Sequence, residues 1–222
     1  MNWRIRNLDG ITITSNSDAH SPQKLGREAT VIASDMSFDA IMGAIRTNDQ
    51  RLVGTIEFFP EEGKYHGDGH RLCNVLFTPQ QTRAAKGLCP VCAKPLVVGV
   101  QYRVDQLASR PAETAEPAKR VEYIVPLVEI LAELRGIKTT TGRPILNEYH
   151  RLVIQLGSEF DILRKLPIDQ IRSVSPPVAL AIERMRSGQV HRRPGFDGVY
   201  GTIKVFRNHD ERLQTLSQLQ SL

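Results

Sequence analysis

Three cysteines and a histidine carry the clearest chemical signal in the chain. Two ligand pairs, each with two intervening residues, lie fifteen residues apart: His70 and Cys73, then Cys89 and Cys92. Paired turns of this kind present four soft donors to a tetrahedral Zn²⁺ ion. A histidine has to be the fourth ligand, since position 76 is Leu and not Cys. His70 fits by spacing, and His66 is the alternative because the glycines beside it allow it to fold back. All four positions are filled by protein, so the site is expected to be structural.

A different interpretation of Cys89 and Cys92 is a reduced or redox-active pair beside surface histidines. Redox chemistry at a Cys-x-x-Cys motif requires a thioredoxin-like unit around it, and the sequence shows none. The zinc interpretation is therefore favoured.

A second candidate site is Asp18-Ala19-His20. In an extended backbone, residues two apart point to the same side, so a carboxylate and an imidazole would face one metal ion. Such a pair suits Zn²⁺ or Mn²⁺ in a hydrolase. A capping Asp next to a surface His is the alternative interpretation of so short a motif.

Near the C-terminus, the window 184–207 is strongly basic. It contains one acid, Asp197, and six cations: Arg184, Arg186, Arg192, Arg193, Lys204 and Arg207. Aromatic and glycine residues are interspersed, as is typical of surfaces that bind a phosphate backbone. These six residues are predicted to bind DNA, and a solvated helix end with an ordinary hairpin is the alternative.

The elements that must position these residues fall into three parts. In 1–60 we expect a strand at 11–14, a polar loop at 15–22, a helix from Phe38 capped by Ser37, and a strand from Leu52 to Phe58. Residues 61–104 are rich in Gly, His, Cys and Pro and lack helical periodicity, so this zinc-binding module needs its metal. Residues 105–222 are predicted to be mainly helical. Their helices are expected at 127–134, 149–156, 158–166, 175–185 and 213–219, with a strand at 199–206.

Composition excludes several classes of protein. The chain has 222 residues, a formal charge of +5 and 41% hydrophobic residues. No apolar stretch approaches the roughly 18 residues that a membrane span needs. Three cysteines cannot all pair, and no apolar leader follows Met1, so we expect a cytoplasmic protein without a disulfide framework.

Several longer strings are similar to a known family. Residues 15–29 (SNSDAHSPQKLGREA) resemble the last metal motif of the polymerase-and-histidinol-phosphatase (PHP) superfamily. Residues 64–73 (KYHGDGHRLC), 87–92 (GLCPVC), 98–104 (VGVQYRV), 126–130 (PLVEI) and 194–201 (PGFDGVYG) resemble endonuclease Q, in the same order along the chain. The resemblance implies an α/β fold with a partial PHP-type barrel at 1–60, a small zinc-binding module at 61–104, and a mainly helical, basic DNA-binding region at 105–222.

The resemblance also implies a function. Endonuclease Q is a DNA-repair enzyme that hydrolyses a phosphodiester on the 5′ side of deaminated bases (uracil, hypoxanthine, xanthine) or abasic sites. Asp18 and His20 would then be ligands of a catalytic cluster of Zn²⁺, Mn²⁺ or Mg²⁺, and His70, Cys73, Cys89 and Cys92 would hold the structural Zn²⁺. The expected partner is DNA that carries such lesions, without a membrane.

The N-terminal part of the sequence differs from the pattern of the family. Its histidines stand at 20, 66, 70, 150, 191 and 209, so the His-x-His motif that opens the family's barrel is missing. Two ligands cannot hold a two-metal centre. We therefore expect the C-terminal part of such an enzyme, inactive without its N-terminal barrel half, which a separate chain could supply. The alternative is a non-catalytic, zinc-stapled DNA-binding module that assists repair or helicase proteins. PHP phosphatase chemistry on a small ester explains neither the zinc module nor the basic region.

Overall fold

The computed structural model describes residues 1–220, without the side chains of residues 113 and 218–220. The contacts divide the chain into two compact units. Unit 1 comprises Met1–Glu122 and Arg193–Thr202, and unit 2 comprises Tyr123–Arg192 and Ile203–Leu222. The three-part division at 1–60, 61–104 and 105–222 stays a prediction. Unit 1 contains the first two of these parts, together with residues 105–122 and 193–202 of the third.

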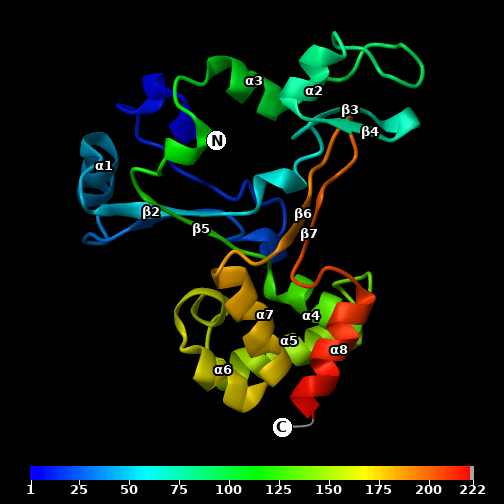
Figure 1. Cartoon of the computed structure of the whole chain (residues 1–222). Helices are drawn as coiled ribbons and strands as arrows, with labels where there is room; N and C mark the ends of the chain where they lie inside the picture. Colours follow the sequence, from blue (N-terminus) through cyan, green and yellow to red (C-terminus); the bar gives the residue numbers. More distant parts are fainter. Residues whose placement is uncertain (221–222) are drawn as a thin grey trace. The chain divides into compact units, whose positions relative to one another are not determined.

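Unit 1 contains a three-stranded sheet in the order β1-β2-β5, formed by Ala29–Ile32, Leu52–Glu57 and Arg120–Tyr123 (Figure 1). The strands β1 and β2 are antiparallel and are joined by helix α1, Phe38–Thr47. The predicted cap of this helix is present, since the Ser37 hydroxyl accepts a hydrogen bond from the Ala40 N–H. Strand β2 also lies where the alternating pattern predicts it, and its Leu52 and Ile56 are buried.

The predicted strand at Ile11–Thr14 is wrong. This segment pairs with no strand, and side chains hold it instead: the Thr12 hydroxyl donates to the carbonyl of Ile45 at 2.8 Å. Immediately after it, Ser15 N–H donates to the Thr30 hydroxyl, which donates in turn to the Ser15 carbonyl. A four-residue β-rich pattern says nothing about whether a pairing partner is available. Ala29–Ile32 forms the ladder with β2 in its place.

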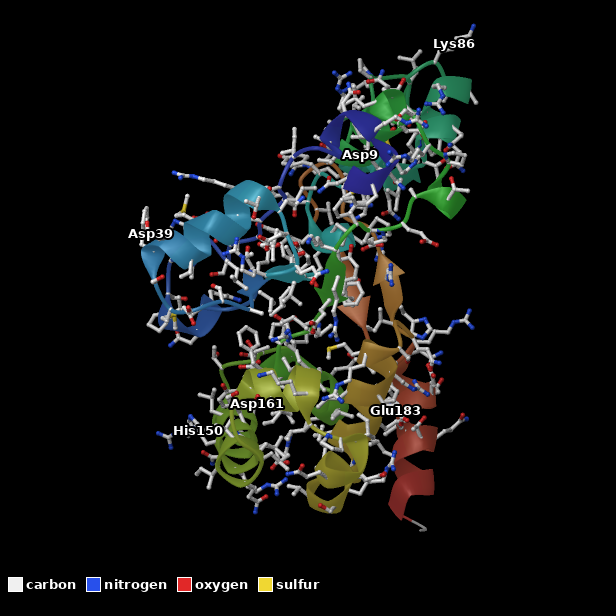
Figure 2. All side chains as sticks on the ribbon, turned by 90° about the vertical axis from the view of Figure 1, so that its left-hand side faces the viewer. Asp9, Asp39, Lys86, His150, Asp161 and Glu183 are labelled. Carbon is white, nitrogen blue, oxygen red and sulfur yellow. The ribbon has the colours of Figure 1, made fainter. Side chains whose placement is uncertain are left out.

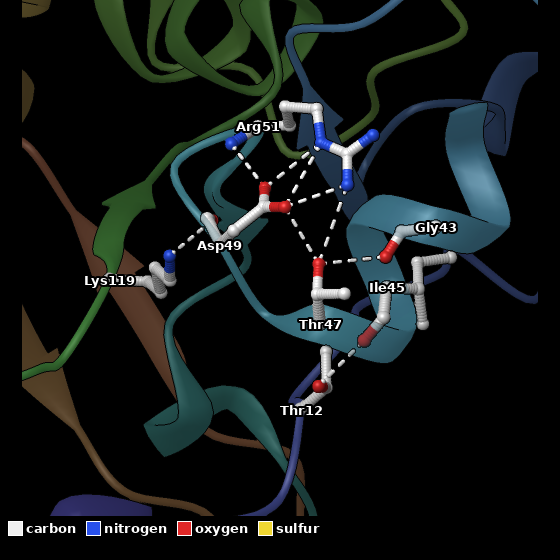
Figure 3. Close-up of polar contacts among 7 residues, drawn as sticks. All are labelled: Thr12, Gly43, Ile45, Thr47, Asp49, Arg51 and Lys119. Carbon is white, nitrogen blue, oxygen red and sulfur yellow. Dashed lines mark hydrogen bonds and ion pairs between the residues drawn. The ribbon is translucent and has the colours of Figure 1, made fainter.

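The turn between α1 and β2 is fixed by a polar network around Asp49 (Figure 3). Its carboxylate accepts from the Arg51 guanidinium and backbone N–H and from the Thr47 hydroxyl, and these bonds hold the pKa of Asp49 well below its usual range. Lys119 donates to the Asp49 backbone carbonyl at 2.6 Å. Lys119, 70 residues further along the chain, is thereby attached to this turn.

The rest of unit 1 surrounds the cysteines. Strands β3 (Asp68–His70) and β4 (Val75–Phe77) form an antiparallel hairpin, with the 3-10 turn Arg71–Cys73 between them. Two helices follow, α2 (Pro79–Ala84) and α3 (Val100–Leu107), although the sequence of 61–104 lacks helical periodicity. Helix α2 begins at a capping box between Thr78 and Gln81, a local signal that the hydrophobic periodicity does not register.

One buried carboxylate connects these elements. Asp68 is 1% exposed, and its two oxygens accept from the Thr82 hydroxyl at 2.6 Å and the Gly99 N–H at 2.7 Å. A buried carboxylate with both oxygens bonded in this way fixes the start of α3 against β3. The buried apolar cluster that supports these elements is small and consists of Val75, Cys89 and Leu96.

Unit 2 is helical, as predicted for this part of the chain. Its helices are α4 (Leu127–Arg135), α5 (Arg143–Leu156), a π-helix (Asp161–Lys165), α6 (Ile168–Val174), α7 (Pro176–Arg186) and α8 (His209–Gln220). Helix α4 is capped at its C-terminus by Gly136, whose φ of 68° lies in the left-handed region that favours glycine, and α5 is capped by Gly157. Helix α6, which lies between the predicted helices at 158–166 and 175–185, is an addition to the expected set.

The core of unit 2 lies between these helices. Leu127 and Ile130 of α4, Leu152 of α5, Ile171 of α6 and Ile182 of α7 are all essentially inaccessible. Each such side chain stabilises the folded state by about 1.5–3 kcal/mol through burial.

Strands β6 (His191–Arg193) and β7 (Thr202–Lys204) form a separate two-stranded ribbon, so the strand expected over 199–206 is shorter than predicted.

The fold is mixed α and β, as expected, but a partial parallel barrel is not seen in residues 1–220. The first two strands of its sheet are antiparallel, and a parallel barrel needs parallel neighbours. Within the same residues, no helix combines the length and apolar character that crossing a bilayer requires.

Candidate functional site

The clearest site is a group of four potential metal ligands in unit 1. The ligand atoms of His70, Cys73, Cys89 and Cys92 all lie within 4.8 Å of one another. The Cys92 Sγ is 3.5 Å from the His70 Nδ1. Ligands placed tetrahedrally around Zn²⁺ at about 2.3 Å are themselves about 3.8 Å apart, so the group fits such an ion. Three thiols and an imidazole could hold a metal such as zinc.

Backbone turns bring the cysteines to this position. His70 ends β3, and Cys73 ends the turn before Asn74, which has a left-handed φ of 51°. In the second pair, the Cys89 N–H donates to the Lys94 carbonyl and the Ala93 N–H to the Cys89 carbonyl. Ala93 has a φ of 58°, which is unusual for a residue with a Cβ. The second loop is therefore held in a closed turn by its own backbone.

The thiols differ in acidity because their surroundings differ. Burial acts to raise the pKa of the Cys89 thiol, but hydrogen bonds from the backbone N–H groups of Cys92 and Val91 outweigh it, and the pKa falls to about 6. Burial and the two neighbouring thiols raise the pKa of Cys73 to about 11. The lowered pKa favours the thiolate form of Cys89, which is the form of cysteine that binds metals.

The two candidate histidines are separated by the fold. His70 belongs to the group of four, whereas His66 is buried outside it, with its backbone bonded to Gly63 and Gln101. The arrangement therefore favours His70 as the fourth ligand. A third histidine, His150, is distant in sequence from this group, does not belong to it, and is exposed on α5 (Figure 2).

Asp18 and His20 lie in an exposed loop of unit 1. Asp18 has a φ of 45°, in the left-handed region that is uncommon for a residue with a side chain. The His20 Nδ1 is 2.8 Å from the Asp18 carbonyl oxygen, and since a carbonyl only accepts, this nitrogen has to carry the proton. The Nε2 lone pair is then available to a cation, as in many metal-binding histidines. In the part of the chain that the structure describes, no third His, Cys, Asp or Glu joins them in a metal-holding group.

Close to this loop, the structure reveals a carboxyl pair that the sequence analysis missed. Burial, followed by the charge and hydrogen bond of Glu57, raises the pKa of Glu28 to about 7. Ser15, three residues before Asp18, donates from its hydroxyl to Glu57 at 2.9 Å. The two glutamates are 29 residues apart in the chain, and only the antiparallel pairing of β1 with β2 brings them together.

A cavity of about 190 Å³ opens beside this pair. Its lining includes Ser17, Arg27, Glu28, Phe58 and Tyr200. The Arg27 guanidinium lies 5.2 Å from the Phe58 ring centroid, and Tyr200 is 71% exposed. The residue before Asp18 therefore borders a hollow that contains both aromatic and charged groups.

The basic window is divided between structural and exposed side chains. Arg186 donates to the carbonyls of Ile162, Leu163 and Leu166 at 2.7–2.9 Å, and so caps the end of the π-helix. Arg184 lies over the Phe206 ring at 4.8 Å and forms an ion pair with Glu211 at 2.9 Å. Both guanidinium groups are thus engaged within unit 2. The other four predicted DNA-binding residues are exposed: Arg192, Arg193, Lys204 and Arg207.

Two known families match parts of the chain. A family described as PHP-associated matches residues 3–49, and the MJ0043 C-terminal domain matches residues 126–189. The first match covers Asp18 and His20, and the second covers most of unit 2.

Two curated relatives match most of this chain. The uncharacterized protein MJ0043 of Methanocaldococcus jannaschii is 30% identical over 211 residues, which are 90% of this chain and 26% of that protein. The uncharacterized protein YqxK of Bacillus subtilis is 26% identical over 204 residues, which are 90% of this chain and 48% of that protein. The chain thus spans about a quarter to a half of the length of these relatives.

Two crystal structures are similar over nearly the whole chain. The lesion-specific endonuclease PfuEndoQ from Pyrococcus furiosus matches with a TM-score of 0.81 and 30% identity, over 99% of this chain and 55% of that one. Endonuclease Q in complex with a 27-mer duplex that has an abasic lesion at the active site matches with a TM-score of 0.75 and 29% identity, over 95% of this chain and 55% of that one. The predicted resemblance is confirmed: in sequence and in fold, this chain is similar to endonuclease Q, a lesion-specific DNA endonuclease.

Proposed function

We propose that this chain forms part of a DNA-repair endonuclease that hydrolyses a phosphodiester on the 5′ side of deaminated bases (uracil, hypoxanthine, xanthine) or abasic sites. The observation that carries the proposal is the similarity to PfuEndoQ over 99% of the chain at a TM-score of 0.81. Endonuclease Q with an abasic duplex gives further support. The protein is proposed to act in the cytoplasm.

In this proposal, the group of four in unit 1 holds a structural Zn²⁺. Its three thiols and one imidazole are the donor set of structural zinc sites, and all four positions are occupied by protein. The small apolar cluster around Cys89 cannot stabilise the surrounding loops alone. The metal would therefore hold the hairpin β3-β4 against the second cysteine loop.

Asp18 and His20 are proposed as ligands of a catalytic cluster of Zn²⁺, Mn²⁺ or Mg²⁺. Such a cluster supplies an activated water and neutralises the charge of the phosphodiester. In this chain, Asp18 would offer its carboxylate, and His20 its Nε2, with the ring oriented by the bond from Nδ1 to the Asp18 carbonyl. Two ligands are too few for such a centre, so the remaining ligands are proposed to come from a barrel segment with a His-x-His motif, in cis or in a separate chain.

DNA binding is assigned to the four exposed cations of the basic window. Arg192, Arg193, Lys204 and Arg207 can contact phosphates because all four are exposed. Arg184 and Arg186 act indirectly, since they stabilise unit 2, which carries Arg192, Lys204 and Arg207.

The test is a nicking assay on a labelled duplex with one deoxyuridine. The 222-residue chain alone should bind the duplex but not nick it, with Mn²⁺ or Zn²⁺ present. Addition of a barrel segment with the His-x-His motif should restore nicking on the 5′ side of the lesion. Asp18→Ala and His20→Ala should each abolish the restored activity. Nicking by the chain alone, or restored nicking that survives both substitutions, would contradict the proposed assignment.

A second candidate is a non-catalytic, zinc-stapled DNA-binding module that assists repair or helicase proteins. The exposed position of Asp18 and His20, without a third ligand among the described residues, favours it. The same assay separates the two candidates, because the module should bind DNA equally well with either substitution and should not nick DNA with any barrel segment.

A further inference from the structure

Unit 2 contains a cavity of about 500 Å³, and of its lining residues the proposed function uses only Lys204. It is bordered by the end of α4, the loop that follows α4, the strand end at Ile203 and Lys204, and the start of α8. All of these segments belong to unit 2.

Cations predominate among the charged groups of its lining. Lys138, Lys204 and Arg212 carry permanent positive charge, against the carboxylates of Glu129 and Glu133. Both oxygens of Glu133 already accept backbone N–H groups, those of Val205 at 2.9 Å and Phe206 at 2.8 Å. This carboxylate thus serves to fix the chain after β7, and the lysines are exposed and project from two separate segments.

Arg212 is the most constrained of these cations. It is 8% exposed, and it donates to the Glu133 carbonyl at 2.8 Å, which caps the end of α4. Its Nε has no hydrogen-bond partner although it is buried. A guanidinium held in place with incomplete hydrogen bonding is a strong fixed positive charge at the cavity wall.

The same guanidinium determines which ring nitrogen of His209 carries the proton. Arg212 is 2.7 Å from the Nδ1 of His209, and because a guanidinium can only donate, Nδ1 has to accept. In the neutral ring the proton is then on Nε2, so His209 offers an N–H donor without being charged. With the hydroxyl of Thr140, the cavity contains donors of four kinds: guanidinium, ammonium, imidazole N–H and hydroxyl.

The remaining wall is apolar. Val125, Ile137 and Ile203 line it, and Ile137 is 37% exposed. A free inorganic anion gains nothing from such a wall, whereas the CH groups of a sugar attached to a phosphate can pack against it. The lining therefore suits a phosphate group on a sugar.

We propose that this cavity binds a phosphate of a nucleic-acid strand, with Lys138, Lys204, Arg212 and His209 contacting the phosphate oxygens and the apolar wall contacting the adjacent sugar. The source of the phosphate rests on the proposed function in DNA repair; the phosphate chemistry itself does not. Lys204 then serves as a cavity residue and not only as part of a diffuse basic surface.

The first experiment measures DNA affinity of the full chain by fluorescence anisotropy over a range of salt concentrations. The variant is Lys138→Ala with Lys204→Ala, and the matched control is Arg143→Ala with Lys165→Ala, which removes two exposed unit 2 cations outside the cavity. The cavity variant should flatten the log–log salt slope by about one to two and weaken binding about tenfold at 0.1 M salt, while the control changes neither as much. Equal effects of the two variants would overturn the proposal.

The second experiment does not depend on DNA binding. In ¹H–¹⁵N spectra, inorganic phosphate and a deoxynucleoside 5′-monophosphate are titrated separately at constant ionic strength. Both should give saturable shifts at residues 138–140 and 209, with the nucleotide binding more tightly, and the Lys138→Ala/Lys204→Ala variant should lose them. Absence of saturable shifts, or saturation by an acidic peptide but not by phosphate, would overturn the proposal. A chain that binds phosphate here but no DNA would contradict the proposed function and leave the phosphate site standing.

Discussion

Replacing Arg186 tests whether this cation serves the fold or the DNA. Its guanidinium donates to the carbonyls of Leu163 and Ile162 at 2.9 Å and of Leu166 at 2.7 Å. These carbonyls lie at the end of the π-helix, where no further helical N–H groups are available. Arg186→Met keeps most of the apolar stem and removes all three bonds.

The expected loss follows from these contacts. A hydrogen bond from a charged group contributes about 1.5–3 kcal/mol net, and the three bonds are not additive because they share one guanidinium. The bond to Leu166 is exposed, so water replaces part of it. We expect Arg186→Met to lower the free energy of unfolding by about 3 kcal/mol. For a chain of this size, that corresponds to a fall in Tm of about 6–12 °C.

Thermal and urea unfolding, monitored by circular dichroism at the helical band, measures this change in the free energy of unfolding and in Tm. The control is Arg207→Met, an exposed residue of the same window, whose backbone N–H bond to Glu211 survives the substitution. The control should change stability by less than about 0.5 kcal/mol and flatten the salt dependence of DNA binding by about one unit. The reasoning is refuted if Arg186→Met leaves stability unchanged and flattens the salt dependence as Arg207→Met does.

Three further predictions follow from unit 1 and the basic ribbon. Cys89→Ser should release the metal and unfold the segment around it, because apparent zinc stabilisation is about 10 kcal/mol or more; metal analysis that finds less than half an equivalent of zinc in the purified wild-type protein would contradict the site. Replacing Arg192 and Arg193 by Ala should flatten the salt slope of DNA affinity by about one to two for any DNA sequence, and a salt-insensitive affinity would show that the ribbon does not bind phosphates. Glu28 has a folded-state pKa of about 7, above the ordinary 4.5, so the folded state retains this proton longer and stability should fall as the pH rises from about 4.5 to 7. Because the side chain is partly exposed, the loss of stability should be about 1 kcal/mol. Glu28→Gln should remove this pH dependence. If the free energy of unfolding of the two proteins changes equally between pH 4.5 and 7, the raised pKa is contradicted.

The sequence alone determined the features that depend on local spacing. The interval of two residues in each ligand pair selected the four side chains that the fold gathers within 4.8 Å. Proline and glycine determined most helix ends in unit 2, as at Pro126 and Gly136 around α4, because these residues restrict or free the backbone regardless of context. The resemblance to endonuclease Q rested on strings of the same local kind.

The tertiary structure decided everything that depends on distant partners. Arg186 and Arg207 are alike as residues in a basic window, yet one caps a helix and the other faces solvent. Glu28 acquires its raised pKa from burial and from the neighbouring Glu57 only when β1 and β2 pair, and Ala29–Ile32 pairs with β2 whereas Ile11–Thr14 forms no strand. Charge, titration and strand pairing are properties of neighbours in space, and a chain specifies those neighbours only by folding.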